Sequence, residues 1–140
     1  MSPLLHGEQG LVEDAVRLCR KLSHPNLGAV FCGYHWFAVD GKNLNATLAD
    51  ASPFLRDANL CGSRRITDQS GERCTLEPLD DGELDNFAVL GALDSVGFRG
   101  MIGFQGYSIG GDAYHKLKRS LTAYNDMRRR LKEHANWPAM

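Results

Sequence analysis

The sequence predicts an α/β fold in which about four short, parallel strands alternate with helices, as in half of a (β/α)8 TIM barrel. Short apolar runs alternate along the chain with segments whose apolar residues recur at helical spacing. This alternation is typical of βα units around a parallel sheet. A complete barrel takes about 250 residues, whereas this chain has 140.

The predicted strands are short apolar segments. The run LGAVFCGYHWF is continuous, as expected of a strand that is covered on both faces, and places one strand near residues 28–33. The others are predicted near residues 2–6, 55–60 and 100–104. The helices between them allow all four strands to pair in parallel.

Helical patterns cover residues 11–22, 44–51, 83–97 and 113–133. Gly97 is the expected C-cap of the third helix, and Asp112 is the expected N-cap of the last. The polar stretch 62–82 shows neither pattern and is expected to be a loop. The stripe expected to be buried on the last helix is Leu117, Leu121, Tyr124 and Leu131.

Composition predicts one soluble domain over residues 1–140. The formal net charge is −1, from 16 basic and 17 acidic residues, so the chain as a whole has no pull toward nucleic acid or anionic membrane. The basic last helix is better explained as a solvated face that complements the helix dipole.

No apolar run is long enough to span a membrane and no leader is apparent, so a cytoplasmic location is expected. The four separated cysteines are expected to be reduced.

Polar and aromatic residues gather where the predicted strands end. In barrels of βα units, the chemistry collects at the carboxyl ends of the strands. Those ends hold His6 and the segments CGYHW (32–36), NLCGSRR (59–65) and FQGYSIGGD (104–112). They therefore supply the candidate site.

Three segments resemble a known family. They are NLGAVFCGYHWFAVDG, LEPLDDGELDNFAVLGALDSVGFRGMIGFQGYSIGGDA and LKRSLTAY, and their most specific parts are YHW, PLDDGELD and GFQGYSIGGD. Together they resemble the carboxyl-terminal half of the xylose isomerase-like TIM barrels, the sugar phosphate isomerase/epimerase group. The resemblance runs from His6 to about Leu131 and leaves the first half of the barrel unmatched.

The resemblance implies a divalent metal that is held at the strand ends and chelated by a sugar. The family's ligand positions fall here at Leu5, Cys32, Asn59 and Gln105. Amide oxygens can join a calcium or magnesium shell but supply no charge. We therefore expect no catalytic metal and no other cofactor.

His35 is the candidate catalytic residue, because an imidazole can bind a hydroxyl or shuttle its proton near neutral pH. The candidate substrate-binding residues are His6, Trp36, Asn59, Arg64, Gln105 and Tyr107.

Four of these assignments have a structural alternative. His35 can be a hydrogen-bonded core group, Trp36 can be packing, Arg64 can be solvated, and Gln105 can satisfy buried backbone groups. The segment SIGGD could bind phosphate through its backbone, but the cap formed by Asp112 would occupy the same N–H groups.

Two functions remain open on this evidence. The first is a sugar isomerase or epimerase-like protein that works without the usual metal once its barrel is completed. The second is a non-catalytic remnant that binds sugar or is purely structural. Four strands cut from a barrel expose two edges and an apolar inner face. A homodimer, or a complex with a separately encoded first half, is therefore expected, with the contact built from the strands and not from the last helix.

Overall fold

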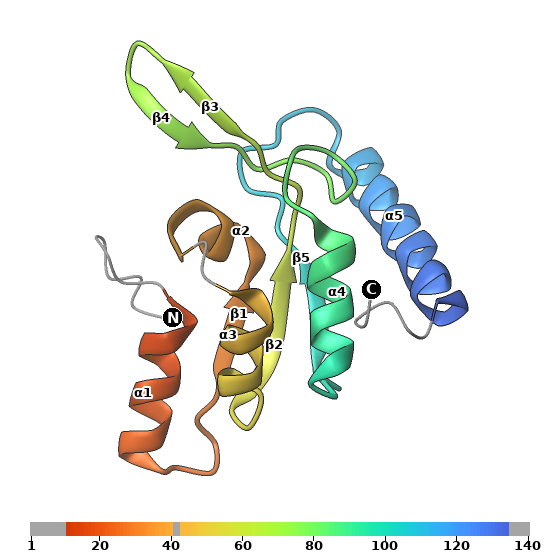
Figure 1. Cartoon of the computed structure of the whole chain (residues 1–140). Helices are drawn as coiled ribbons and strands as arrows, with labels where there is room; N and C mark the ends of the chain where they lie inside the picture. Colours follow the sequence, from red (N-terminus) through yellow and green to blue (C-terminus); the bar gives the residue numbers. More distant parts are fainter. Residues whose placement is uncertain (1–10, 41–42, 135–140) are drawn as a thin grey trace.

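Three parallel strands and the helices that follow them form the body of the protein (Figure 1). The computed structural model describes residues 11–40 and 43–134. The strands of the main sheet are β1 (Ala29–Cys32), β2 (Leu55–Leu60) and β5 (Met101–Phe104). The helices are α1 (Val12–Leu22), α2 (Gly33–His35), α3 (Leu44–Ala51), α4 (Asn86–Ser95) and α5 (Ala113–Glu133), with a π-helical turn, η1 (Trp36–Asp40), after α2.

The sheet has the strand order β1-β2-β5, and both pairings are parallel. Cys32 lies beside Asn59, which lies beside Gly103, so these three residues form one row across the sheet. The prediction of parallel strands near 28–33, 55–60 and 100–104 is confirmed. The strand predicted at 2–6 lies outside the described residues.

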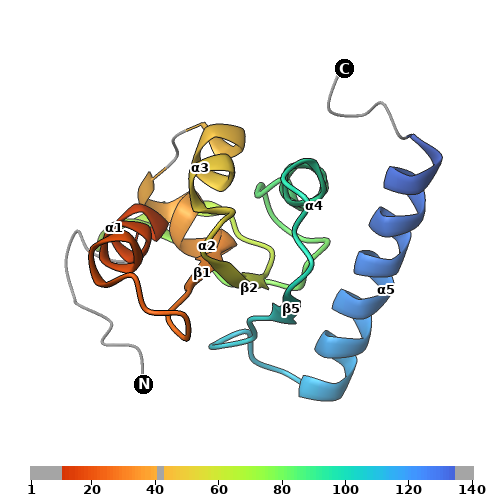
Figure 2. The same ribbon diagram turned by 90° about the horizontal axis from the view of Figure 1, so that it is seen from below.

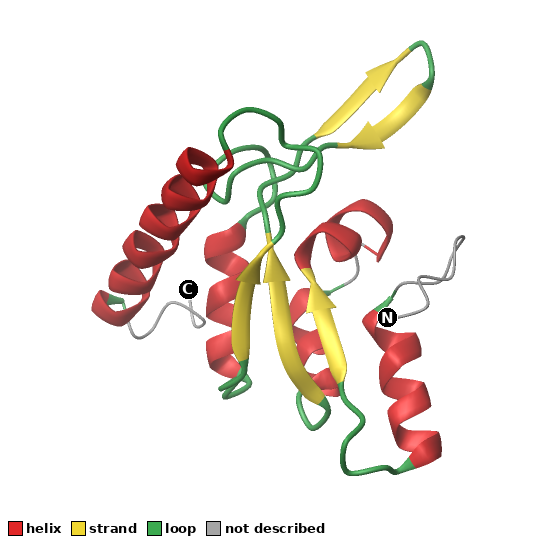
Figure 3. Ribbon diagram, turned by 180° about the vertical axis from the view of Figure 1, so that it is seen from behind, coloured by secondary structure: helices red, strands yellow, loops and turns green. Residues whose placement is uncertain are grey.

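Helices α1, α3 and α4 cover one face of the sheet, while no described helix lies over the other (Figure 3). On the covered face, Phe31, Ala58 and Leu60 are fully buried, and they join a core that includes Leu48 of α3 and Leu90 of α4. On the other face, Val30 is 45% exposed and Met101 is 74% exposed. The sheet is therefore an open segment, with its apolar layer on the helix side.

The ends of two helices follow the expected chemistry. Gly97 adopts a φ of +71°, and its N–H donates to the carbonyl of Asp94 while the N–H of Phe98 donates to Leu93. These paired bonds form a Schellman motif, which ends α4 one residue after its C-cap, Val96. At the start of α5, the Asp112 carboxylate accepts from the N–H of Tyr114 and acts as the N-cap.

The expected loop at 62–82 contains an antiparallel hairpin, so that part of the prediction is wrong. Its strands are β3 (Arg65–Asp68) and β4 (Gly71–Cys74), and they pair only with each other. Most of their residues are exposed, so the sequence lacks the apolar alternation that marks a half-buried strand. The hairpin projects beyond the carboxyl ends of the main strands (Figure 1) and leaves their parallel pairing intact.

The expected buried stripe of α5 is wrong for two of its four residues. Leu117 is 51% exposed and Leu121 is 49% exposed, whereas Leu131 is buried and Tyr124 is partly buried. The helix lies beside α4 at the β5 side of the sheet (Figure 2), and no other described element follows β5 on that side. No helix among the described residues is both long enough and apolar enough to cross a membrane.

Candidate functional site

The candidate site lies where β1, β2 and β5 end, because parallel strands bring their carboxyl ends to one edge (Figure 1). Each strand leads into a different structure there. β1 runs directly into α2, β2 runs into the segment before the hairpin, and β5 runs into a glycine-rich loop. The site is therefore built from strand ends and the first residues after them.

Cys32 and Gln105 connect the outer two strands above the central one. The Cys32 thiol donates to Oε1 of Gln105 over 3.3 Å, although the two residues are 73 positions apart in the sequence. Burial raises the pKa of the Cys32 thiol, against the opposing effect of backbone hydrogen bonds from His35 and Tyr34. The thiol therefore stays protonated near neutral pH and serves as a donor.

The backbone of Gln105 is equally well held, because its N–H donates to the carbonyl of Leu60 over 2.8 Å. This bond extends the pairing of β2 with β5 by one residue beyond Phe104. Among the described residues, nothing accepts from the Gln105 side-chain nitrogen. The amide is thus fixed at its oxygen and retains two donors.

Asn59 sits between Cys32 and Gly103 on the face of the sheet that has no helix. Its side chain is exposed and leans over β5, since a Cβ at Gly103 would lie 3.0 Å from Asn59 Oδ1. A side chain at position 103 would crowd the amide. Glycine therefore leaves Asn59 room to present both a donor and an acceptor beside Gln105.

His35 and Trp36 follow Cys32 directly. His35 ends α2 and is partly buried, with its ring edge-on to Tyr34 at 5.4 Å between centroids. Trp36 begins η1 and packs against the core. Trp36 thus packs as its structural alternative expects, and His35 places an imidazole next to the strand end.

Tyr107 lies further out than the other candidates. It is 78% exposed in the loop after β5 and lines a pocket of about 420 Å³ with Cys74, Thr75 and Lys116, among other residues. The hairpin contributes Arg73 and Cys74 to this pocket, and the carbonyl of Cys74 also accepts a hydrogen bond from the Tyr34 hydroxyl over 3.4 Å. Tyr107 therefore belongs to a pocket between the hairpin and the β5–α5 loop.

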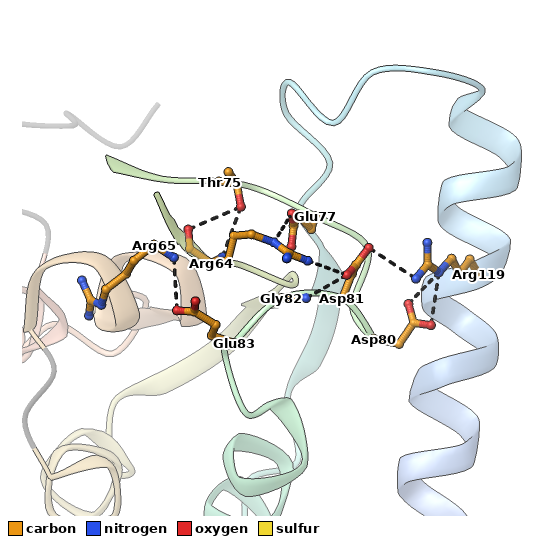
Figure 4. Close-up of polar contacts among 9 residues, drawn as sticks. All are labelled: Arg64, Arg65, Thr75, Glu77, Asp80, Asp81, Gly82, Glu83 and Arg119. Carbon is orange, nitrogen blue, oxygen red and sulfur yellow. Dashed lines mark hydrogen bonds and ion pairs between the residues drawn. The ribbon is translucent and has the colours of Figure 1, made fainter. Parts of the chain in front are cut away.

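Arg64 is held by two carboxylates (Figure 4). Its Nε donates to Glu77 over 2.8 Å, and its terminal nitrogen donates to Asp81 over 2.8 Å. The hydrogen bond to Glu77 is the largest cause of the raised pKa of the Arg64 guanidinium. Asp81 also pairs with Arg119 of α5, so this network links the hairpin segment to α5.

Sequence reasoning did not identify the supports beneath this edge. Asn86, at the start of α4, is 2% exposed, and its amide nitrogen donates to the carbonyls of Cys61 and Leu79 over 2.8 and 3.0 Å. Ser120 of α5 is also buried and accepts from the N–H of Leu79. The acid-rich LEPLDDGELD segment and the basic SRR segment indicate ion pairs, but no pattern in the sequence marks Asn86 or Ser120.

The described residues do not bring together a set of charged metal ligands. Over 11–40 and 43–134, no three Cys, His, Asp or Glu side chains gather in a way that could hold a metal ion. His6 and Leu5, which were also assigned to the strand ends, lie outside this part of the chain. What the described residues do bring together is a thiol and two amides.

Comparison with solved structures shows the same fold in proteins that are about twice as long. One is a xylose isomerase domain protein from Planctomyces limnophilus, with a TM-score of 0.67 and 16% identity over 89% of this chain and 44% of that one. Another is 3-keto-D-glucoside 4-epimerase from E. coli, with a TM-score of 0.60 and 20% identity over 84% and 39% of the two chains.

A third similar structure is D-psicose 3-epimerase from Clostridium cellulolyticum H10, solved with D-tagatose. It has a TM-score of 0.61 and 12% identity, over 84% of this chain and 43% of that one. The chain thus spans less than half the length of these structures, and at such identities the likeness shows the fold alone. No curated protein matches the sequence.

The family itself is shown by a sequence model that matches nearly the whole chain. The model describes the xylose isomerase-like TIM barrel and matches residues 5–134. Its span agrees with the parallel sheet, the order of βα units and the polar strand ends described above. The chain belongs to the xylose isomerase-like TIM barrel family.

Proposed function

We propose that this chain is a sugar or sugar phosphate isomerase/epimerase-like half-barrel that binds its ligand through uncharged groups and not through a metal. The observation that carries the proposal is the cluster of Cys32, Asn59 and Gln105 at neighbouring strand ends. Two of the three similar structures are named as sugar epimerases, which supports a sugar as the ligand class.

The donor chemistry of this cluster does not fit a hard divalent cation. Such cations prefer carboxylate oxygens, and the three side chains carry no negative charge. The Cys32 thiol is protonated, and Oε1 of Gln105 already accepts its hydrogen bond. A metal would have to break this bond and would gain only neutral ligands.

The same groups suit the hydroxyls of a sugar. A hydroxyl both donates and accepts, and so do the amides of Asn59 and Gln105. The Gln105 amide nitrogen would donate to a sugar oxygen, while the exposed Asn59 amide could take a neighbouring hydroxyl. Arg64 is not included in this proposed site, because Glu77 and Asp81 engage its guanidinium.

His35 is the proposed catalytic residue. Isomerisation and epimerisation move a proton at a carbon or a hydroxyl, and an imidazole can accept or donate that proton near neutral pH. The position of His35 is fixed by α2, whose backbone at Tyr34 and His35 acts to lower the pKa of the Cys32 thiol. The imidazole and the hydrogen-bonding cluster are therefore built on the same strand end.

The proposed site needs the rest of a barrel to enclose it. The helix-free face of the sheet carries exposed Val30 and Met101 below the row of Cys32 and Asn59. In a complete barrel this face is interior and dry. We propose that a second chain covers it.

Thermal unfolding with and without sugars tests the proposal, because a ligand that binds the folded state raises the melting temperature. Sugars or sugar phosphates should raise it equally with and without EDTA, and His35→Ala should abolish the rise while leaving the unliganded melting temperature close to that of wild type. The control variant is His115→Ala, on the exposed surface of α5, which should keep the response. A response that requires added metal would contradict the uncharged site.

The runner-up function is a non-catalytic remnant, and one observation favours it. The Cys32–Gln105 hydrogen bond engages the thiol and the amide oxygen within the protein, as expected if Gln105 has only a structural role. Sugar-induced stabilisation without turnover would support a binding protein. A wild-type melting temperature that no sugar changes would support a purely structural protein.

A further inference from the structure

The open end of the sheet at β5 carries an apolar groove. It has a volume of about 380 Å³ and is lined by Phe98, Ile102, Phe104, Leu121, Tyr124 and Arg128, among others. The rings of Phe104 and Tyr124 meet edge to face at 5.9 Å and form its floor between β5 and α5. Leu121 is 49% exposed at its rim.

The strand beside this groove has an unpaired edge. Among the described strands, β5 pairs only with β2. The N–H of Gln105 points toward β2, and alternate residues of a parallel strand bond to alternate sides, so Ile102 and Phe104 direct their backbone groups to the free edge. An unpaired edge beside apolar side chains is a surface for polypeptide docking.

The opposite end of the half-barrel carries two protruding leucines. On α1, Leu18 is 50% exposed and Leu22 is 57% exposed, and their spacing places them on the same side of the helix. Arg20 projects from roughly the opposite side and bonds to Asp50 of α3 over 2.7 Å. The leucines therefore lie on the side of α1 that faces away from α3. The described chain places no other element on that side.

The exposed apolar residues concentrate on the surfaces that barrel closure would cover. Within residues 11–40 and 43–134, nine large apolar side chains are exposed. Seven of them lie on the helix-free face, on α1 or on α5: Val30, Met101, Leu18, Leu22, Tyr114, Leu117 and Leu121. Seven exposed large apolar side chains on these three surfaces give apolar area that association could bury.

We infer that the occupant of the β5–α5 groove is a second copy of this chain, whose α1 places Leu18 and Leu22 against it. A two-fold axis parallel to the strands keeps the strands of both copies parallel. It also produces two equivalent contacts, so that both open ends of each copy are covered. One end supplies the groove and the other supplies the leucines. This inference rests on the proposed half-barrel and identifies the second chain.

The contact places helix α1 of one copy beside β5 and α5 of the other. The helix α5 is thus part of the contact, in contrast to the expectation that strands alone would form it.

Two variants that each add one cysteine to the four native ones test the geometry. Leu18→Cys and Leu121→Cys should be cross-linked by a short bismaleimide when the two purified proteins are mixed, and neither should cross-link with itself. The wild-type protein provides the background from its native cysteines. Self-cross-linking of either variant would show a different dimer and overturn the inference, as would a ladder of larger oligomers.

Sedimentation at micromolar concentration tests the association. The wild-type chain should sediment at twice its monomer mass, and Leu121→Glu should weaken the dimer roughly tenfold or more, as for an apolar interface anchor. Thr122→Glu adds the same charge next to it but on another side of α5, and it should leave the dimer intact. A compact wild-type monomer would overturn the inference, and so would equal effects of the two variants.

The outcomes separate this inference from the proposed function. A monomer that sugars still stabilise would contradict the dimer and the need for a second chain, but it would leave the uncharged sugar site standing. A dimer that no sugar stabilises would support the assembly and contradict the function. If Leu121→Glu loses its helical circular dichroism, the cross-linking experiment decides alone.

Discussion

Asn86→Ala should lower the free energy of unfolding by about 3 kcal/mol, because it removes the bonds that tie α4 to the end of β2. Asn86 is 2% exposed and donates to two carbonyls, those of Cys61 and Leu79. Leaving a buried acceptor without its donor costs about 1–3 kcal/mol each. Part of that cost is offset, because Oδ1 of Asn86 has no partner among the described residues and its removal relieves a buried polar atom.

Urea unfolding at fixed protein concentration measures the loss, since any dimer makes stability depend on concentration. The matched control is Asp85→Ala, one residue earlier, which removes the N-cap bond to Ala88 from an exposed side chain. Loss of such a cap costs about 1 kcal/mol. If Asn86→Ala costs no more than Asp85→Ala, the two buried bonds do not hold this edge and the reasoning fails.

Two further predictions concern the same edge of the sheet. Gly82→Ala should destabilise the chain by about 3 kcal/mol, since φ is +91° and a Cβ would overlap the carbonyl oxygen of Ser63, whereas Gly71→Ala, at φ +108° in open space, should cost only about 1 kcal/mol. Equal losses in urea unfolding would show that the close approach to Ser63 is unimportant. Burial raises the pKa of Cys61 to about 12 from 9.0, so the folded state keeps a proton that the unfolded state loses, and stability should fall as pH rises from 9 toward 12. The slope this thiol contributes is about 1.4 kcal/mol per pH unit, and Cys61→Ala should remove it; an unchanged slope in the variant would contradict the assignment.

The main sheet was predictable because its strands and helices have distinct apolar periods. The predicted helix 44–51 coincides with α3, and the predicted strand 55–60 coincides with β2. Periodicity also gave the correct limits of α5, but it identified its buried face incorrectly at Leu117 and Leu121. A repeat shows which residues share a face, while burial depends on which neighbour is present.

The site was predictable only as a set of strand ends. The sequence places Cys32, Asn59 and Gln105 at such ends, but it does not show that the Cys32 thiol bonds to Gln105, because that contact depends on which strands are neighbours. The environment of Arg64 depends in the same way on the fold of residues 62–83, which carries no apolar pattern. Polar segments are the places where tertiary contacts, and not local preference, decide the structure.

In the proposed site, neutral groups stand where the family resemblance implies charged metal ligands, and this changes what closure of a barrel would accomplish. A metal site binds its ligand strongly even when water is near, because the ion carries the charge. Hydrogen bonds from a thiol and two amides compete with water, so each contributes only about 1 kcal/mol unless the surroundings are dry. Asn59 is exposed in the single chain, and the face beneath it is open. Recognition of a sugar by these groups therefore depends on covering that face. Sugar binding and assembly should then be coupled, so that the chain that closes the barrel raises the affinity for sugar.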